Sequence, residues 1–164
     1  MQDIIKFIQK IVKDANAKGV VIGISGGIDS AVVGELCVRA LGKEKVYAIC
    51  MPTKFTPQED LEDSEYLCKK WGVSYLINGM EVPEPYFRDS RKEDKNKKQD
   101  VSIGNLLARY RMAILYYYSN IYDYLVVGTT DKSENFIGYF TKYGDGGVDF
   151  EPIIHLTKTQ VKEL

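Results

Sequence analysis

The sequence has few of the residues that mark zinc-binding, secreted or membrane-spanning proteins. Its 164 residues include one histidine and three cysteines, Cys37, Cys50 and Cys68, with no Cys-x-x-Cys pair. This composition disfavours a zinc site and a disulfide framework. No apolar run approaches the roughly 20 residues that a membrane-spanning helix requires, and the first residues do not have the pattern of a secretory signal. Three reduced thiols predict a cytoplasmic protein.

Neither sign of charge dominates the chain. The 22 basic and 23 acidic residues give a net charge of -1. A balance this close to zero disfavours bulk attraction to nucleic acid or to an anionic membrane, so we expect neither as a partner. Apolar residues make up 45% of the sequence, which is ordinary for a globular protein. With roughly 150 residues per domain as a guide, the chain predicts one domain.

Short apolar runs alternate with helical patterns along most of the sequence. An alternation of this kind predicts an α/β fold, a Rossmann-like open parallel sheet with helices on both faces. The predicted strands are 19–24, 46–51, 73–77 and 124–127. The predicted helices are 4–15, 31–41, a third that starts at a capping box over 56–59, and a fourth over 105–121. The fourth has tyrosines all round it, which fits a core helix and a subunit interface equally well.

Two segments depart from this alternation. Residues 79–100 break it, and residues 91–100 hold five basic, three acidic and no apolar residues. Because the signs are mixed, we expect a mobile solvated loop rather than a binding patch. A second capping box, over 157–160, lies close to the end of the chain and no helix stop signal follows it. We therefore expect a single domain, 1–164, that lacks its C-terminal part.

The segment Ser25-Gly26-Gly27-Ile28-Asp29-Ser30 lies between the first predicted strand and its helix. Adjacent glycines let the backbone approach a ligand closely, and the free N–H groups of the following helix favour phosphate. Asp29 suits such a site if magnesium bridges its carboxylate to phosphate oxygens. The alternative is that Asp29 and Ser30 only cap the helix. The loop is not a Walker A motif, because no Gly-Lys-Ser/Thr occurs.

Other strand ends should lie at the same edge of the sheet as this loop, because ligands in open parallel sheets bind at the carboxyl ends of the strands. The segment 51–54 follows the second predicted strand, and the segment 128–134 follows the fourth. The latter combines small hydroxyls with carboxylates. Such a segment fits an adenosine and metal site, and on local evidence it fits an N-cap turn equally well.

These segments together resemble a known family. The loop at 25–30 resembles that of the ATP pyrophosphatases, enzymes that split ATP between its α and β phosphates to adenylate a substrate. Three further segments resemble the signatures of NAD synthetase, in order and spacing: Asn105-Leu106-Leu107-Ala108-Arg109-Tyr110-Arg111-Met112, Gly128-Thr129-Thr130-Asp131-Lys132-Ser133-Glu134, and the segment from Tyr139 to Asp149. The resemblance runs from Gly23 to Lys158 and implies the adenine nucleotide alpha hydrolase-like fold.

The resemblance also implies a reaction and roles for residues. The nicotinate carboxylate of deamido-NAD attacks the α-phosphate of ATP, pyrophosphate leaves, and ammonia displaces AMP. The implied ATP site consists of Gly23, Ile24, Ser25, Gly26, Gly27, Ile28, Asp29, Ser30, Thr129 and Lys158. The implied magnesium ligands are Asp29 and Glu134, and the implied deamido-NAD contacts are Arg109, Lys142 and Asp149. Lys158 would assist catalysis at the phosphates and Asp145 would place ammonia, although an Asp-Gly turn is the simpler interpretation of Asp145.

Three expectations complete the resemblance. The first predicted helix begins near residue 3 and the loop arrives by residue 25, which leaves no room for an amidase domain. We therefore expect the nitrogen donor to be free ammonia, or ammonia from a separate protein. We also expect a homodimer through the helix over 105–121. The alternatives are another adenylating ATP pyrophosphatase, such as a tRNA thiolation enzyme, and a non-catalytic nucleotide-binding module on a similar sheet.

Overall fold

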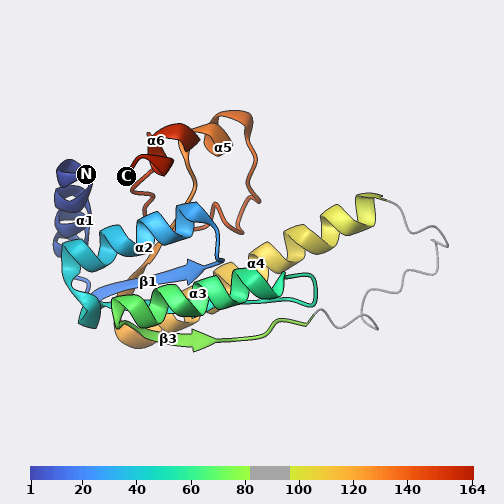
Figure 1. Cartoon of the computed structure of the whole chain (residues 1–164), viewed down its shortest axis with the longest axis horizontal. Coiled ribbons are helices and arrows are strands. Elements are labelled where there is room, and N and C mark those ends of the chain that lie inside the picture. Colours follow the sequence, from blue (N-terminus) through green and yellow to red (C-terminus); the bar gives the residue numbers. More distant parts are fainter. Residues whose placement is uncertain (82–96) are drawn as a thin grey trace.

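The fold is built on one parallel sheet. The computed structural model describes residues 1–81 and 97–164. Four strands, β1 (Gly19–Ile24), β2 (Val46–Cys50), β3 (Ser74–Ile77) and β4 (Tyr124–Val127), pair in the order β3-β2-β1-β4, all parallel (Figure 1). The strands match the predicted ones to within one residue at each end. Their carboxyl ends, and the segments that follow them, therefore lie along one edge of the sheet.

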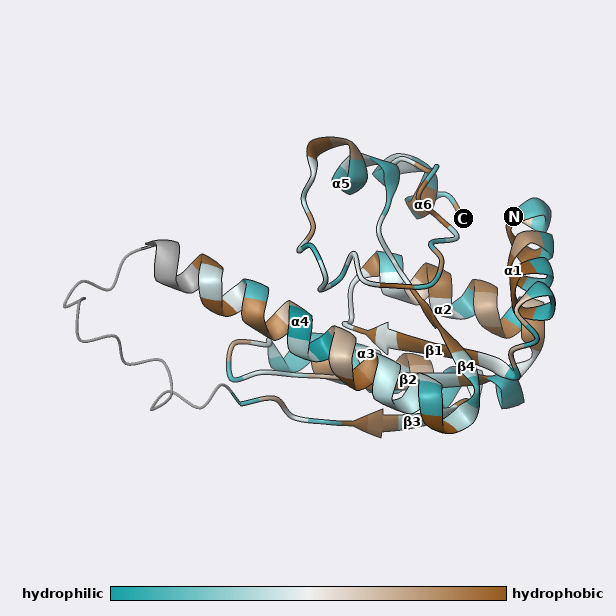
Figure 2. Ribbon diagram, turned by 180° about the vertical axis from the view of Figure 1, so that it is seen from behind, coloured by the Kyte–Doolittle hydropathy of each residue, from teal (hydrophilic) through white to brown (hydrophobic). Residues whose placement is uncertain are grey.

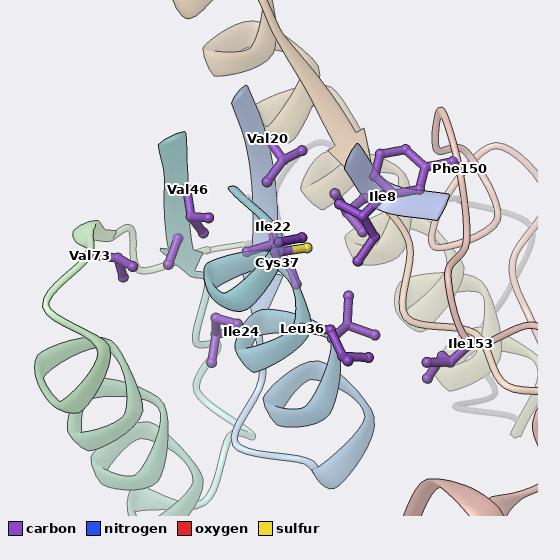
Figure 3. Close-up of a cluster of buried hydrophobic side chains, with 14 of the residues drawn as sticks. Ile8, Val20, Ile22, Ile24, Leu36, Cys37, Val46, Val73, Phe150 and Ile153 are labelled. Carbon is purple, nitrogen blue, oxygen red and sulfur yellow. The ribbon is translucent and has the colours of Figure 1, made fainter. Parts of the chain in front are cut away.

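Helices cover both faces of the sheet, as predicted. On one face, α1 (Gln2–Asp14), α2 (Ile28–Leu41) and α3 (Gln58–Trp71) enclose the larger apolar core. Figure 3 shows part of this core, where Ile8 of α1 and Leu36 of α2 lie beside Ile22 of β1. The long helix α4 (Lys97–Tyr122) covers the opposite face (Figure 2).

Strand β1 is buried on both of its faces, which explains its uninterrupted apolar sequence. Val20 and Ile22 face the core under α1 and α2, whereas Val21 packs with Ile49 of β2 and Leu115 of α4. All three β1 residues are fully buried. The loop from Ser25 to Ser30 thus follows directly on a strand that is buried on both faces.

The predicted capping box at the start of α3 is wrong. The N-cap of α3 is Pro57, and no side chain caps this helix. Thr56 Oγ1 instead accepts a hydrogen bond from Thr53 N at 2.9 Å, because the chain makes a turn directly after β2. The second capping box is confirmed: Thr157 caps α6 (Lys158–Lys162) with Gln160 as its partner.

Two short elements were not predicted, and one helix is longer than expected. Helix α5 (Lys132–Ile137) follows β4, and a 3-10 turn, η1 (Lys43–Lys45), precedes β2. Helix α4 begins at Lys97, within the range predicted to be a loop. The rest of that loop prediction, over 82–96, lies outside the described residues. Among the residues described, no helix is both long and apolar enough to cross a membrane.

Candidate active site

The loop after β1 is a closed hydrogen-bonded turn. Ser30 Oγ donates to Gly27 O at 2.9 Å and accepts from Ser25 N at 3.2 Å, while Gly27 N donates to Ser25 Oγ at 3.3 Å. Gly26 has a φ of +82°, and a Cβ atom there would lie 2.4 Å from the backbone oxygen of Asp60 in α3. Only glycine fits this position, because any side chain would meet both the backbone strain and the clash.

The N-terminus of α2 is left open to an anion. Its N-cap is Gly27, and no side chain caps the helix, so the interpretation of Asp29 and Ser30 as mere capping residues is wrong. Uncapped N–H groups at a helix start carry partial positive charge and bind phosphate readily. Asp29 lies in this first turn, and a carboxylate beside an anion site requires a cation to join the two.

A lysine joins three carboxylates next to this loop. Lys158 Nζ lies 2.6 Å from Asp29 Oδ2, 3.0 Å from Asp131 Oδ2 and 3.4 Å from Glu134 Oε1. Burial alone would lower the pKa of Lys158, but its contacts with Asp29 and Asp131 outweigh burial and raise that pKa. Three carboxylates around one ammonium group leave an excess of negative charge, which favours a further cation.

Two helix starts hold this cluster in place. Asp131 caps α5: its Oδ1 accepts a hydrogen bond from Glu134 N at 2.8 Å, and Glu134 Oε2 accepts one from Asp131 N at 3.4 Å. Lys158 is the first residue of α6, and its backbone N donates to Ser133 Oγ at 3.3 Å. Helix α6 lies beside α5 and packs on α2 (Figure 1), which brings Lys158 to the start of α2.

The residues around Lys158 fit magnesium held jointly with a substrate. Asp29 Oδ1 is buried and has no hydrogen-bond partner among the described residues, so one lone pair of this carboxylate remains to be satisfied. In the part of the chain that the structure describes, no three His, Cys, Asp or Glu side chains are arranged to hold a metal by themselves. Magnesium commonly binds one or two carboxylates plus substrate phosphates, so a site of this kind needs the phosphate as a ligand.

A cavity of about 360 Å³ opens at the same edge of the sheet. It is large enough for part of a nucleotide. Its lining comes from the ends of three neighbouring strands and from two helices. Among the lining residues are Gly23, Ile24, Ser25, Met51, Asp60, Arg111, Gly128, Thr129 and Asp145. The structure therefore brings five predicted site residues from the first strand end and the later segments to one cavity: Gly23, Ile24, Ser25, Thr129 and Asp145.

Arg109 and Lys142 lie together, outside this lining. Arg109 Nε donates to the backbone oxygen of Lys142 at 3.3 Å, and both side chains are exposed. Lys142 Nζ lies 5.0 Å from the centroid of the Tyr143 ring. The segment is tied to α4 by Thr141 Oγ1, which donates to Asn105 Oδ1 at 2.8 Å. Two positive side chains at a solvent-exposed rim can reach an anionic group of a large ligand.

Asp145 is a turn residue that also faces the cavity. Its Oδ1 accepts a hydrogen bond from Thr141 N at 2.8 Å, which closes the turn before it. Asp145 is also one of the residues that line the cavity. The geometry thus combines both interpretations of Asp145, and neither excludes the other.

Both carboxylate oxygens of Asp149 accept hydrogen bonds from other residues. Oδ2 accepts from Val126 N at 2.7 Å, and Oδ1 accepts from Tyr116 Oη at 3.0 Å. Burial raises the pKa of Tyr116 to about 12, with further contributions from this hydrogen bond and from the charge of Asp149. Asp149 lines a second hollow, of about 490 Å³, together with Glu151 and Phe150.

Sequence reasoning missed two residues of the site, Arg111 and Asp131. The Arg111 side chain lines the cavity and donates from Nη2 to Met51 O at 3.2 Å, so it ties α4 to the end of β2. The available signal was its spacing from Arg109, because two arginines two residues apart on a helix point in different directions. For Asp131 the signal was its place three residues before Glu134, the spacing of a capping box.

Comparison with known proteins identifies a family for the chain. The chain matches the NAD synthase family over residues 1–164. An NH3-dependent NAD+ synthetase from Staphylothermus marinus is 49% identical over 163 residues, which is 98% of this chain and 58% of the relative. The chain thus spans less than two thirds of that relative.

Two solved structures share the fold closely. An NH3-dependent NAD synthetase from Campylobacter jejuni superposes with a TM-score of 0.88 at 42% identity, covering 99% of this chain and 69% of that one. A structure titled NMN synthetase, from Francisella tularensis, superposes with a TM-score of 0.88 at 34% identity, covering 99% and 66%. On the family match over its whole length, the chain belongs to the NAD synthase family.

Proposed function

We propose that the protein amidates deamido-NAD to NAD with ammonia, using ATP to form an adenylate and releasing AMP and pyrophosphate. The observation that carries this proposal is the Lys158 cluster at the open start of α2. It unites Asp29, which follows the first strand, with Glu134, which follows the fourth, near a cavity large enough for part of a nucleotide. Family membership supports the same reaction.

The ATP phosphates would bind at the loop from Ser25 to Ser30. The N–H groups at the start of α2 meet phosphate oxygens without a basic side chain, and Asp29 and Glu134 would hold magnesium against them. Bound magnesium would supply charge neutralisation at the phosphate oxygens. Thr129 would contact the adenosine side of ATP from within the cavity.

The reaction must bring two anions together, the nicotinate carboxylate and the α-phosphate. The carboxylate oxygen attacks phosphorus, the bond to the β-phosphate oxygen breaks, and pyrophosphate leaves. Ammonia then attacks the acyl carbon, the bond to AMP breaks, and one proton is released. Lys158 would stabilise charge on the phosphates, and Arg109 and Lys142 would receive deamido-NAD at the rim, with Asp149 nearby.

The test is release of pyrophosphate from ATP in the presence of deamido-NAD. We expect release to require deamido-NAD and magnesium, and NAD to form when ammonium is added. Pyrophosphate release that instead depends on tRNA would show another adenylating enzyme. Nucleotide binding without any acceptor-dependent release would show a non-catalytic module. Nicotinate mononucleotide is the competing acceptor to include, because one close structural neighbour is titled NMN synthetase.

We further propose a homodimer through the outer face of α4. Tyr110, Tyr117 and Ile121 are 43%, 62% and 52% exposed, and their spacing places them along one side of the helix. An apolar stripe of this kind is typical of a protein interface. A cytoplasmic location also stays a prediction, and the three free, buried cysteines fit a reducing compartment.

A further inference from the structure

Asp131 is the most deeply buried carboxylate in the described part of the chain, with 0% of its surface exposed. Burying a carboxylate is unfavourable unless its charge is compensated. Burial would raise the pKa of Asp131, but the backbone N–H of Glu134 and the ammonium group of Lys158 outweigh burial and hold that pKa below its usual range. The buried charge is therefore balanced by its partners.

The two oxygens of Asp131 have different tasks. Oδ1 accepts the hydrogen bond that caps α5, from Glu134 N at 2.8 Å. Oδ2 lies 3.0 Å from Lys158 Nζ and has no hydrogen bond among the described residues, so the contact is an ion pair, and it joins the start of α6 to the start of α5. Because Asp131 is fully enclosed, it cannot offer an oxygen to a hydrated metal ion, whereas the side chains of Asp29 and Glu134 are 19% and 33% exposed.

The three acidic neighbours of Lys158 differ in whether they can also bind a metal ion. Asp29 and Glu134 suit magnesium and phosphate chemistry, so their oxygens would be drawn away from the lysine when substrate binds. Asp131 would not be drawn away, since it is buried and fixed by its capping hydrogen bond. The lysine thus has one permanent partner and two exchangeable ones.

We propose that Asp131 is a positioning residue that keeps the Lys158 ammonium group at the start of α2, where it meets the phosphates once Asp29 and Glu134 ligate magnesium. Without Asp131, the flexible side chain of Lys158 would move with the half-buried carboxylates of Asp29 and Glu134 or turn toward solvent. This inference deepens the proposed function. It rests on that function only in assuming that a phosphate group binds next to Lys158.

The experiment is a double-mutant cycle with Asp131→Asn and Lys158→Met in the full protein. Asn caps helices as well as Asp does, so α5 keeps its N-cap while the charge is removed. The probe is inorganic pyrophosphate with magnesium, measured by calorimetry, which needs neither deamido-NAD nor ammonia. We expect Asp131→Asn to weaken pyrophosphate binding about tenfold when Lys158 is present, and less than twofold when residue 158 is methionine.

Unfolding of the same four proteins gives a readout that needs no ligand. Lys158→Met should lower the melting temperature, because it leaves Asp131 buried and without its cation. Adding Asp131→Asn should then restore stability in part, although it should not restore pyrophosphate binding. The matched control is Asp123→Asn, which removes the partner of Lys18 in an exposed ion pair at 2.7 Å and should change neither measurement.

The outcomes separate this inference from the proposed function. Equal losses of pyrophosphate binding from Asp131→Asn in both backgrounds would overturn the inference, and so would no loss in either. If Asp131→Asn reduces folding, Asp131→Ser, another good N-cap residue, replaces it in the cycle. Failure of deamido-NAD to stimulate pyrophosphate release would reject the proposed function. The double-mutant cycle would still test the inference, because it measures only the binding of pyrophosphate and magnesium.

Discussion

Lys158 Nζ lies 2.6 Å from Asp29 Oδ2, although 129 positions of sequence separate the two residues. The contact joins the first turn of α2 to the first turn of α6. A charged pair from segments far apart in the sequence thus meets at the loop from Ser25 to Ser30.

Asp29→Asn should abolish the response of the enzyme to magnesium. The change removes the charge of one proposed ligand, and we expect kcat/KM for ATP to fall at least about 100-fold, since metal-held phosphate positioning supplies several kcal/mol. Stability should change by less than about 1 kcal/mol, because Lys158 keeps Asp131 and Glu134 as partners. Magnesium titrations of turnover and thermal unfolding measure the two effects.

The matched control for Asp29→Asn is Glu35→Gln, one helix turn and a half further along α2. Among the described residues, Glu35 forms an ion pair only with Arg39, on the surface of the helix. Removing the charge of Glu35 should leave turnover unchanged. An Asp29→Asn protein with the magnesium requirement of the wild type would exclude Asp29 as a ligand.

Gly26→Ala should destabilise the protein more than Gly42→Ala. Both glycines have positive φ, +82° and +84°, so alanine is strained at either position, by about 1–3 kcal/mol. A Cβ atom at residue 42 meets nothing within 4 Å, whereas at residue 26 it would lie 2.4 Å from Asp60 O. Chemical denaturation of the two variants isolates the clash, and equal free energies of unfolding would show that the loop yields freely.

The sequence predicted strand β1 well because this strand is buried on both faces. The apolar run Val20 to Ile22 predicted a buried strand, and the glycines at 26 and 27 predicted the turn after it. The capping boxes were less informative, because Thr56 and Thr157 share one local pattern and only Thr157 caps its helix. At Thr56 the competing hydrogen bond from Thr53 N decided the outcome.

The candidate site was predictable only in part. Asp29 and Glu134 follow strand ends, so topology alone indicated that they lie close together. Asp131 was missed as a site residue because its buried charge matters only once Lys158 is folded against it. A contact between residues on α5 and α6 has no local sequence signal, and it depends on how the two helices pack.

Tyr116 should titrate far above an ordinary tyrosine, and Asp149→Asn should lower its pKa. Burial, the hydrogen bond to Asp149 and the charge of Asp149 raise the pKa of Tyr116 to about 12. A raised folded-state pKa gives stability that is complete below the unfolded value, about 10, and is lost as the pH rises through 12. The stability difference between wild type and Tyr116→Phe should therefore shrink over that interval.

The phenolate absorbance, taken as the difference between wild type and Tyr116→Phe, measures this titration directly. In the Asp149→Asn protein the midpoint should move toward lower pH, because the carboxylate charge no longer opposes ionisation. A midpoint that does not move would show that burial alone sets the pKa of Tyr116.

Tyr117→Asp should convert the proposed homodimer into monomers. The side chain is 62% exposed on the outer face of α4, and a buried charge at an apolar interface would be strongly unfavourable. Tyr66→Asp on α3 is the matched control, because Tyr66 is also 62% exposed. Sedimentation at micromolar concentration reports the oligomeric state. A wild-type monomer, or loss of the dimer in both variants, would refute the interface.

Asp145→Asn tests how ammonia is placed. At neutral pH nearly all ammonia is ammonium, which has no lone pair, so a site that captures the ion needs a carboxylate and must then remove a proton. Asp145 lines the cavity, and its Oδ1 closes a turn by accepting a hydrogen bond from Thr141 N. Asparagine keeps that acceptor and removes the charge, so the turn should survive the substitution.

We expect the Asp145→Asn protein to form the adenylate at a nearly normal rate and to convert it to NAD slowly. Exchange of labelled pyrophosphate into ATP measures adenylation, and NAD formation measures the second step. The concentration of ammonium needed for half-maximal NAD formation should rise about tenfold or more. Because the fraction of free ammonia grows with pH, this requirement should ease at higher pH. An ammonium requirement equal to that of the wild type would leave Asp145 with its turn hydrogen bond alone.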